Sequence, residues 1–187
     1  MMEKKVFNES IEYIQKKIKE ILGKVNQDDI EKVKNLFFKT NRIFVYGAGR
    51  SGLVAKAFAI RLIHLGFQAF VIGETITVPV KKGDLVIIVS GSGETIPAVM
   101  TAEIAYKIGA NVVSITGKKK SEIAKFADVT IYIASSCNEV ERRKYAPLGT
   151  LFEASVWILL DGFVADLLHS KKETEDIMRS RHATLEH

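Results

Sequence analysis

Hydrophobic positions recur every three or four residues through the first part of the chain. Over residues 3–22 this spacing predicts an amphipathic helix, and Gly23 ends it. A second segment of the same kind begins at Asp28 and Asp29, where acidic side chains stabilise the N-terminal end of a helix. We therefore expect a helical arm over residues 1–40.

The pattern changes after residue 41, where five short apolar runs rich in β-branched and aromatic residues appear. These runs are IFVY, FQAFVI, DLVIIVS, NVVSIT and DVTIYIA. Helical spacing returns between them, over residues 53–64, up to Ile108, and over residues 121–126. Apolar strands that alternate with helices are typical of a parallel sheet covered on both faces. We predict an α/β fold, a three-layer αβα sandwich whose five-stranded parallel sheet has the flavodoxin-like order 2-1-3-4-5, within residues 41–134.

The last part of the chain is expected to be helical after a polar loop. Residues 135–149 are polar and predict a loop, and the apolar stretch over residues 150–168 predicts a buried helix. Three acidic residues interrupt that stretch, so it does not match a membrane span: Glu153, Asp161 and Asp166. We expect C-terminal helices over residues 149–182, and the length of 187 residues fits a single domain over residues 1–187.

Composition and charge narrow the classes of function. Hydrophobic residues make up 47% of the chain and charged residues 26%, which excludes a disordered protein. The net charge of +5 favours anionic partners, but the lysines are scattered without interleaved aromatic residues, so we expect no nucleic-acid partner. The single cysteine, Cys137, cannot form an internal disulfide, and the first ten residues lack the apolar run of a signal peptide. We expect a cytoplasmic protein with no membrane partner, in which Cys137 is a loop or core thiol.

A glycine-rich loop follows the first predicted strand. Its residues match GxGxxG between a strand and a helix: Gly47, Ala48, Gly49, Arg50, Ser51 and Gly52. Glu74 follows about twenty residues later, at the end of the second predicted strand, as in dinucleotide-binding folds. A dehydrogenase would need a substrate domain, whereas only about forty helical residues follow the last loop. A bare NAD-binding module remains as an alternative.

A second glycine-rich loop follows the third predicted strand and carries three hydroxyls. Its residues are Ser90, Gly91, Ser92, Gly93, Glu94 and Thr95. Hydroxyls, glycines and the free N–H groups of a helix N-terminus suit a phosphate dianion. The alternative is a helix cap in which Ser92 caps toward Thr95. Because the carboxyl ends of parallel strands meet at one edge, we expect both loops to hold one phosphorylated ligand.

The chain resembles the SIS (sugar isomerase) domain family. The matching segments are GAGRSG, FAIRLIHLGF, VIGETITVP, DLVIIVSGSGET, KYAPLGTLFE and the terminal RH, within residues 42–182. SGSGET is typical of SIS domains in general, whereas RLIHLGF followed by GET, and APLGTLFE, are similar to the 6-phospho-3-hexuloisomerase branch. The resemblance implies interconversion of D-arabino-hex-3-ulose 6-phosphate and D-fructose 6-phosphate by a tetramer without a cofactor. An isomerase of arabinose 5-phosphate or of a heptose phosphate, and a non-catalytic phosphosugar sensor, remain alternatives.

The implied reaction moves a carbonyl from C3 to C2 through a 2,3-enediol. It needs a base above the sugar and acids near the two oxygens. Glu153 lies in the first turn of the predicted apolar helix, where partial burial suits a base. The spacing of Thr150 and Glu153 by itself favours a capping box. In SIS isomerases a glutamate at this helix start acts as the base, so the resemblance favours Glu153 as catalytic.

Two histidines are further candidates. His64 ends a predicted helix, a position where the helix dipole alone can stabilise it. The resemblance implies a role near the substrate, in its own site or in that of a neighbouring subunit. His182 lies in a charged tail, and the resemblance makes it a second candidate acid–base residue. The histidines and acids show no metal-ligand spacing, so no metal is expected.

Other polar residues complete the expected site. Arg50 could pair with phosphate or an enediolate oxygen, or form a salt bridge at the sheet edge. Glu74 and Thr75 could contact sugar hydroxyls. The residues expected to bind substrate or phosphate are Gly47, Gly49, Arg50, Ser51, Thr75, Ser90, Gly91, Ser92, Gly93, Glu94 and Thr95.

Overall fold

A parallel five-stranded sheet forms the centre of the computed structural model, which describes residues 2–40, 42–134 and 137–183. The strands are β1 (Arg42–Gly47), β2 (Gln68–Val71), β3 (Leu85–Ser90), β4 (Asn111–Thr116) and β5 (Val129–Tyr132). Their order is β2-β1-β3-β4-β5 and every pairing is parallel. The predicted fold class and strand order are therefore confirmed. His187, to which the sequence assigns no role, lies outside the described residues.

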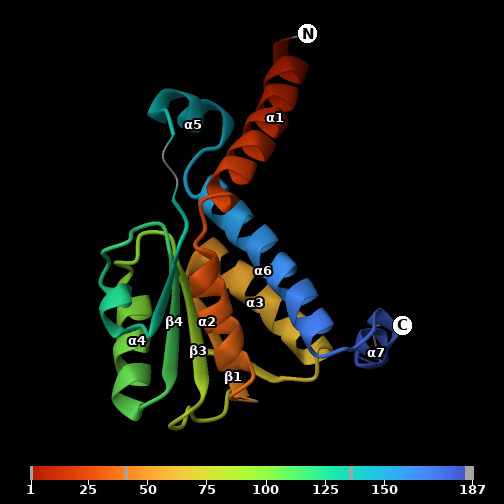
Figure 1. Ribbon diagram of the computed structural model, residues 1–187. Coiled ribbons are helices and arrows are strands. Elements are labelled where there is room, and N and C mark those ends of the chain that lie inside the picture. Colours follow the sequence, from red (N-terminus) through yellow and green to blue (C-terminus); the bar gives the residue numbers. More distant parts are fainter. Residues whose placement is uncertain (1, 41, 135–136, 184–187) are drawn as a thin grey trace.

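Helices cover both faces of the sheet, which completes the expected three layers (Figure 1). One face carries α2 (Gln27–Phe37), α3 (Gly49–His64) and α6 (Thr150–Ser170). The other carries α4 (Ile96–Ile108) and the short 3₁₀ helix η1 (Ile123–Phe126). Successive strand residues face opposite layers, so Ile43 and Val45 pack against the first and Phe44 against the second. No helix in the described part of the chain is long and apolar enough to cross a membrane.

The N-terminal helix α1 (Met2–Leu22) projects beyond the sheet (Figure 1). Near its C-terminal end, Ile18 and Ile21 are buried. Halfway along, the ring of Tyr13 lies 5.5 Å from that of Tyr145 in the short helix α5 (Glu139–Tyr145). The helix α7 (Glu175–Ser180) lies at the far end of the molecule. The expected arm is thus divided, because α1 projects whereas α2 packs on the sheet.

Two connections differ from the expected pattern. Residues 72–84 join β2 to β3 without a helix, so strands and helices do not alternate there. Side chains hold this segment instead, since Arg42 donates a hydrogen bond to the carbonyl of Pro79 at 2.6 Å. In the expected polar loop the chain forms α5, whose first N–H groups are capped by Asn138. Because α5 buries no residue, its sequence carries no apolar spacing that could have predicted it.

Phe37, at the end of α2, gives a test of the hydrophobic core between the sheet and the helices α2, α3 and α6. It is 1% exposed, and its ring lies 5.1 to 6.2 Å from the rings of Phe58, Phe67 and Phe163. Phe37→Ala should lower the free energy of unfolding by about 3–5 kcal/mol, measured by urea denaturation. The adjacent Phe38 is 52% exposed, so Phe38→Ala should cost about 0.5 kcal/mol or less. Equal losses for the two variants would contradict this packing.

Candidate functional site

The two glycine-rich loops lie side by side at the carboxyl edge of the sheet. β1 pairs with β3, and Gly47 is in register with Val89, so the loops leave neighbouring strands about 4.8 Å apart. The chain passes from β1 to β2 on one side and to β3 on the other. Ligands of open α/β sheets bind at such a reversal of strand order.

The first loop is tightly packed against the helix that follows it. α3 begins at Gly49, four residues before the expected Leu53, so the loop forms the first turn of the helix. A Cβ on Gly52 would lie 2.4 Å from the carbonyl oxygen of Gly47, and one on Gly47 would lie 2.7 Å from the carbonyl carbon of Ser51. The strand and helix backbones therefore touch, and the N-terminus of α3 opens directly at the sheet edge.

Hydrogen bonds among its own residues shape the second loop. Ser90 is 4% exposed; its hydroxyl accepts from the N–H of Gly93 at 3.2 Å and donates to Thr95 Oγ1 at 3.3 Å. The hydroxyl of Ser92 accepts from the N–H of Glu94 at 3.2 Å. Ser92 is exposed and Thr95 half-buried, so these two hydroxyls are the more accessible to a ligand.

The helix after this loop starts later than a Ser92 cap requires. α4 begins at Ile96 and its N-cap is Thr95, so the alternative in which Ser92 caps the helix is wrong. Pro97 in the first turn fixes the backbone there and has no N–H to satisfy. Within the described residues Thr95 makes no side-chain capping bond. The start of α4 thus suits an anion.

Glu153 lies beside the first loop, in the first turn of α6. It is 9% exposed and forms an ion pair with Arg50 of α3. Its carboxylate covers Gly149, where a Cβ would lie 3.1 Å from Oε1. The capping box is wrong: the N–H of Thr150 donates to the carbonyl of Pro147 at 3.3 Å, and the carboxylate points to Arg50 instead. Arg50 therefore makes a salt bridge at the sheet edge, one of its two expected roles.

A cleft of about 390 Å³ opens beside this ion pair. It is lined by Arg50, Leu53, Val54, Glu153, Ala154, Trp157 and Ile158. The Arg50 side chain is 69% exposed at its rim, whereas that of Glu153 is 11% exposed. A small polar ligand in the cleft would meet a carboxylate inside and an exposed cation at the mouth.

Glu74 and Thr75 lie after β2 and are exposed. Glu74 forms an ion pair with Lys56 of α3 rather than with either glycine loop, and both side chains are 49% exposed. The carboxylate that a dinucleotide site would use for a ribose is thus already paired. Glu74 and Glu153 thus pair with different residues of α3, Lys56 and Arg50 respectively.

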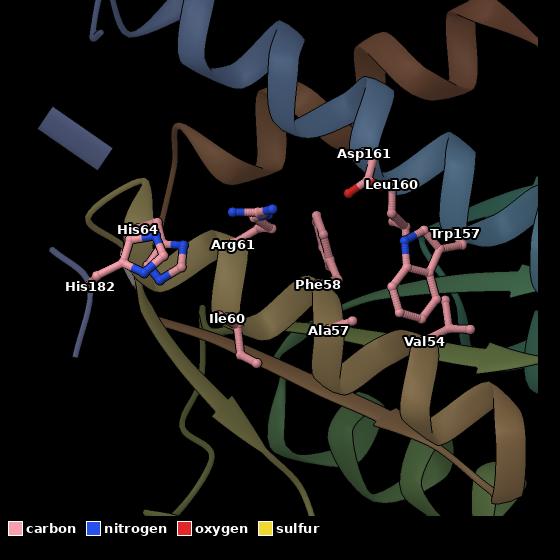
Figure 2. Close-up of a pocket in the computed structure, with 10 residues that line it drawn as sticks. All are labelled: Val54, Ala57, Phe58, Ile60, Arg61, His64, Trp157, Leu160, Asp161 and His182. Carbon is pink, nitrogen blue, oxygen red and sulfur yellow. The ribbon is translucent and has the colours of Figure 1, made fainter. Parts of the chain in front are cut away.

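His64 and His182 stack on one another at the opposite end of α3 (Figure 2). Their ring centroids are 3.9 Å apart and the planes differ by 16°. Arg181 holds this segment, because its guanidinium donates to the carbonyl of His64 at 3.0 Å and to Glu173 at 2.7 Å. Lys171 donates to the carbonyl of Leu65. Two cations therefore occupy the C-terminal end of α3, where the helix dipole favours positive charge.

The two groups of candidates are well separated within one chain. Arg50, which touches Glu153, lies fourteen residues before His64 on α3, and a rise of 1.5 Å per residue gives about 21 Å between them. The histidines line a second cleft of about 330 Å³. This cleft shares Val54 and Trp157 with the first, so one groove runs between α3 and α6 (Figure 2).

Comparison with known proteins identifies the family. The family model of the SIS domain matches residues 36–152. This chain belongs to the SIS domain family. A 3-hexulose-6-phosphate isomerase from Bacillus subtilis is 37% identical, over 87% of this SIS chain and 89% of its own. One from Methylomonas aminofaciens is 34% identical over 96% and 99%. A crystal structure of a Methanococcus jannaschii protein, with an inferred function of 3-hexulose-6-phosphate isomerase, has a TM-score of 0.85 at 32% identity, covering 95% and 99%.

Two groove residues of this SIS domain were not predicted as site residues. Arg61 and Asp161 line the cleft between the histidines and Trp157 (Figure 2). Asp161 was noted only because it interrupts an apolar stretch, and Arg61 lies one turn before His64 on a helix. Within the described residues, no group of three or more His, Cys, Asp or Glu side chains could hold a metal ion.

Lys171 and Arg181 both pair with Glu173, and we call this group the Glu173 clamp. It makes the stability of the fold depend on pH. The hydrogen bond from Arg181 lowers the pKa of Glu173 below its ordinary value of 4.5, and one from Lys171 adds to this. The charged carboxylate therefore stabilises the fold above pH 4.5, and this contribution is lost as the pH falls below that value. Glu173→Gln should lower the Tm near neutral pH, and the difference from the wild type should close in acid. Glu175→Gln, at a side chain that is 81% exposed, should show no such dependence; a matching one would refute the clamp.

Proposed function

We propose that this chain is a cytoplasmic isomerase that interconverts D-arabino-hex-3-ulose 6-phosphate and D-fructose 6-phosphate. The observation that carries the proposal is Glu153, a carboxylate that is 9% exposed in the first turn of α6 and paired with the first loop through Arg50. Four relatives named 3-hexulose-6-phosphate isomerase, 32–37% identical, support this choice of substrate.

The phosphate group binds at the second loop in this proposal. The N-terminus of α4 offers the positive end of its dipole, and the hydroxyls of Ser92 and Thr95 donate hydrogen bonds. Lys118 lies 4.0 Å from Glu94 and offsets the negative charge of that carboxylate at the loop. The first turn of α3, with Ser51, faces the same edge and orients the rest of the sugar phosphate.

Glu153 transfers the proton between the two carbons. Its carboxylate takes the proton from C2 of the 3-ulose, the electrons of that C–H bond form the C2–C3 double bond, and the C3 carbonyl becomes an enediolate oxygen. Return of the proton to C3 gives the 2-ketone once the hydroxyl proton on O2 has moved to O3. The guanidinium of Arg50 beside Glu153 stabilises the negative oxygen.

Histidines of a second copy assist the proton shift between the oxygens. His64 lies fourteen residues after Arg50 on α3, about 21 Å along the helix, so one sugar phosphate held beside Glu153 does not reach the histidines. The groove between them has exposed apolar side chains that a second copy would cover. They are Leu53, Ile60, Trp157 and Ile158. We therefore propose a homo-oligomer, a tetramer, in which facing copies complete each other's sites.

Removal of the base tests the proposed reaction. Glu153→Gln should lower kcat by about 10²- to 10⁴-fold, because the amide cannot accept the proton. Calorimetric binding of fructose 6-phosphate should persist. The measurement is a coupled assay that converts hex-3-ulose 6-phosphate, with arabinose 5-phosphate as the competing substrate. Asp166→Asn, on the same helix but paired with Lys34, is the matched control and should keep full activity. Preference for arabinose 5-phosphate, or binding without turnover by the wild type, would refute the assignment.

Mixed oligomers test the shared site. Glu153→Gln and His64→Ala should each be poorly active alone. When equal amounts are unfolded together and refolded, about a quarter of the sites should combine an intact glutamate with an intact histidine from another chain. Activity of the mixture should therefore rise to about a quarter of the wild-type value. A mixture no better than the mean of its components would rule out sharing between copies.

A further inference from the structure

The ring of Phe152 packs directly on the backbone of the second loop. A Cβ built on Gly91 would lie 3.1 Å from Cδ1 of this ring and 3.4 Å from Cε1. A Cβ on Gly117, in the turn after β4, would lie 3.7 Å from Cδ2. Phe152 is 7% exposed. Phe152, the residue next to Glu153, thus packs on the bare backbone of two glycines.

The segment after β4 holds the backbone of the second loop in place. The N–H of Gly117 donates to the carbonyl of Gly91 at 3.1 Å, and the N–H of Ile123 donates to the carbonyl of Gly93 at 3.1 Å. Gly93 has a φ of 66° and lies against Ser121, whose Cβ would be 2.4 Å from an added Cβ. The loop therefore cannot retreat from Phe152 without breaking these contacts.

We propose that Phe152 is a positioning residue that sets the height of the Glu153 carboxylate above the bound phosphate. Both residues belong to the first turn of α6, a rigid helical backbone, so a shift at Phe152 moves Glu153 by a similar distance. Phe152 touches the loop and not the reacting atoms. The inference rests on the proposed function, because it assumes that the loop holds phosphate and that Glu153 moves the proton.

Gly91→Ala tests the contact from the loop side. The backbone at Gly91 is outside the left-handed region, so alanine fits its conformation and keeps the N–H group. The methyl group would push against the ring at 3.1 Å and displace Glu153 by a few tenths of an ångström, and we expect kcat to fall by about tenfold, less than for a misplacement near 1 Å. Fructose 6-phosphate affinity, measured by calorimetry, should change by less than about threefold, because the loop keeps its backbone donors.

Phe152→Leu supplies the rescue. Leucine removes the ring edge that opposes residue 91, so kcat of the double variant Gly91→Ala with Phe152→Leu should exceed that of Gly91→Ala by about threefold. Phe152→Leu alone should lower kcat with KM unchanged. The control is Gly162→Ala on the same helix, whose added Cβ meets nothing within 4 Å and should leave kcat unchanged.

The outcomes separate this inference from the proposed function. If Glu153→Gln abolishes turnover while Gly91→Ala keeps wild-type kcat, or if the double variant shows additive losses, Phe152 does not position the base. A loss confined to ligand affinity would also overturn it. If Gly91→Ala does not fold, as judged by its Tm, the unchanged KM and lowered kcat of Phe152→Leu decide alone. An inactive wild type would refute both proposals.

Discussion

β1 and β3 pair directly in the sheet although β2 lies between them in the sequence, and the geometry of the site depends on this pairing. It places two glycine-rich loops on adjacent strands, with Gly47 in register with Val89. The first turn of α6 can then touch both loops, Glu153 through Arg50 and Phe152 through Gly91. A different strand order would separate the two loops, and the first turn of α6 could then not contact both of them.

The apolar pattern was sufficient for the sheet because the central strands are compact apolar runs buried on both faces. β3 shows this most clearly, since all six of its residues are buried. The apolar pattern did not predict the structure of two segments whose conformation depends little on burial. Residues 72–84 are fixed by polar contacts such as Thr77 to the carbonyl of Val71, and α5 is held by the Asn138 cap. Such contacts depend on geometry that spacing along the chain does not encode.

The candidate site was predictable in its parts but not in its arrangement. The loops were found because glycines and hydroxyls are unusual beside apolar runs, whereas the resemblance, and not its spacing from Thr150, favoured Glu153 as catalytic. Which partner Glu153 takes was not predictable, because its pairing with Arg50 joins positions 103 residues apart. The stack of His64 on His182 likewise depends on how α7 returns over the end of α3. Helix α3 then sets the distance between the Arg50–Glu153 pair and this histidine stack.

The cations at the C-terminal end of α3 have a consequence for how substrate arrives. Lys171 and Arg181 donate hydrogen bonds to carbonyls at the C-terminal end of the helix, whereas its N-terminus opens at the sheet edge beside that of α4. The positive potential is therefore strongest at this edge of the sheet. It attracts a doubly charged anion before any specific contact forms. Encounter should be fast in dilute buffer and slower as added salt screens this attraction.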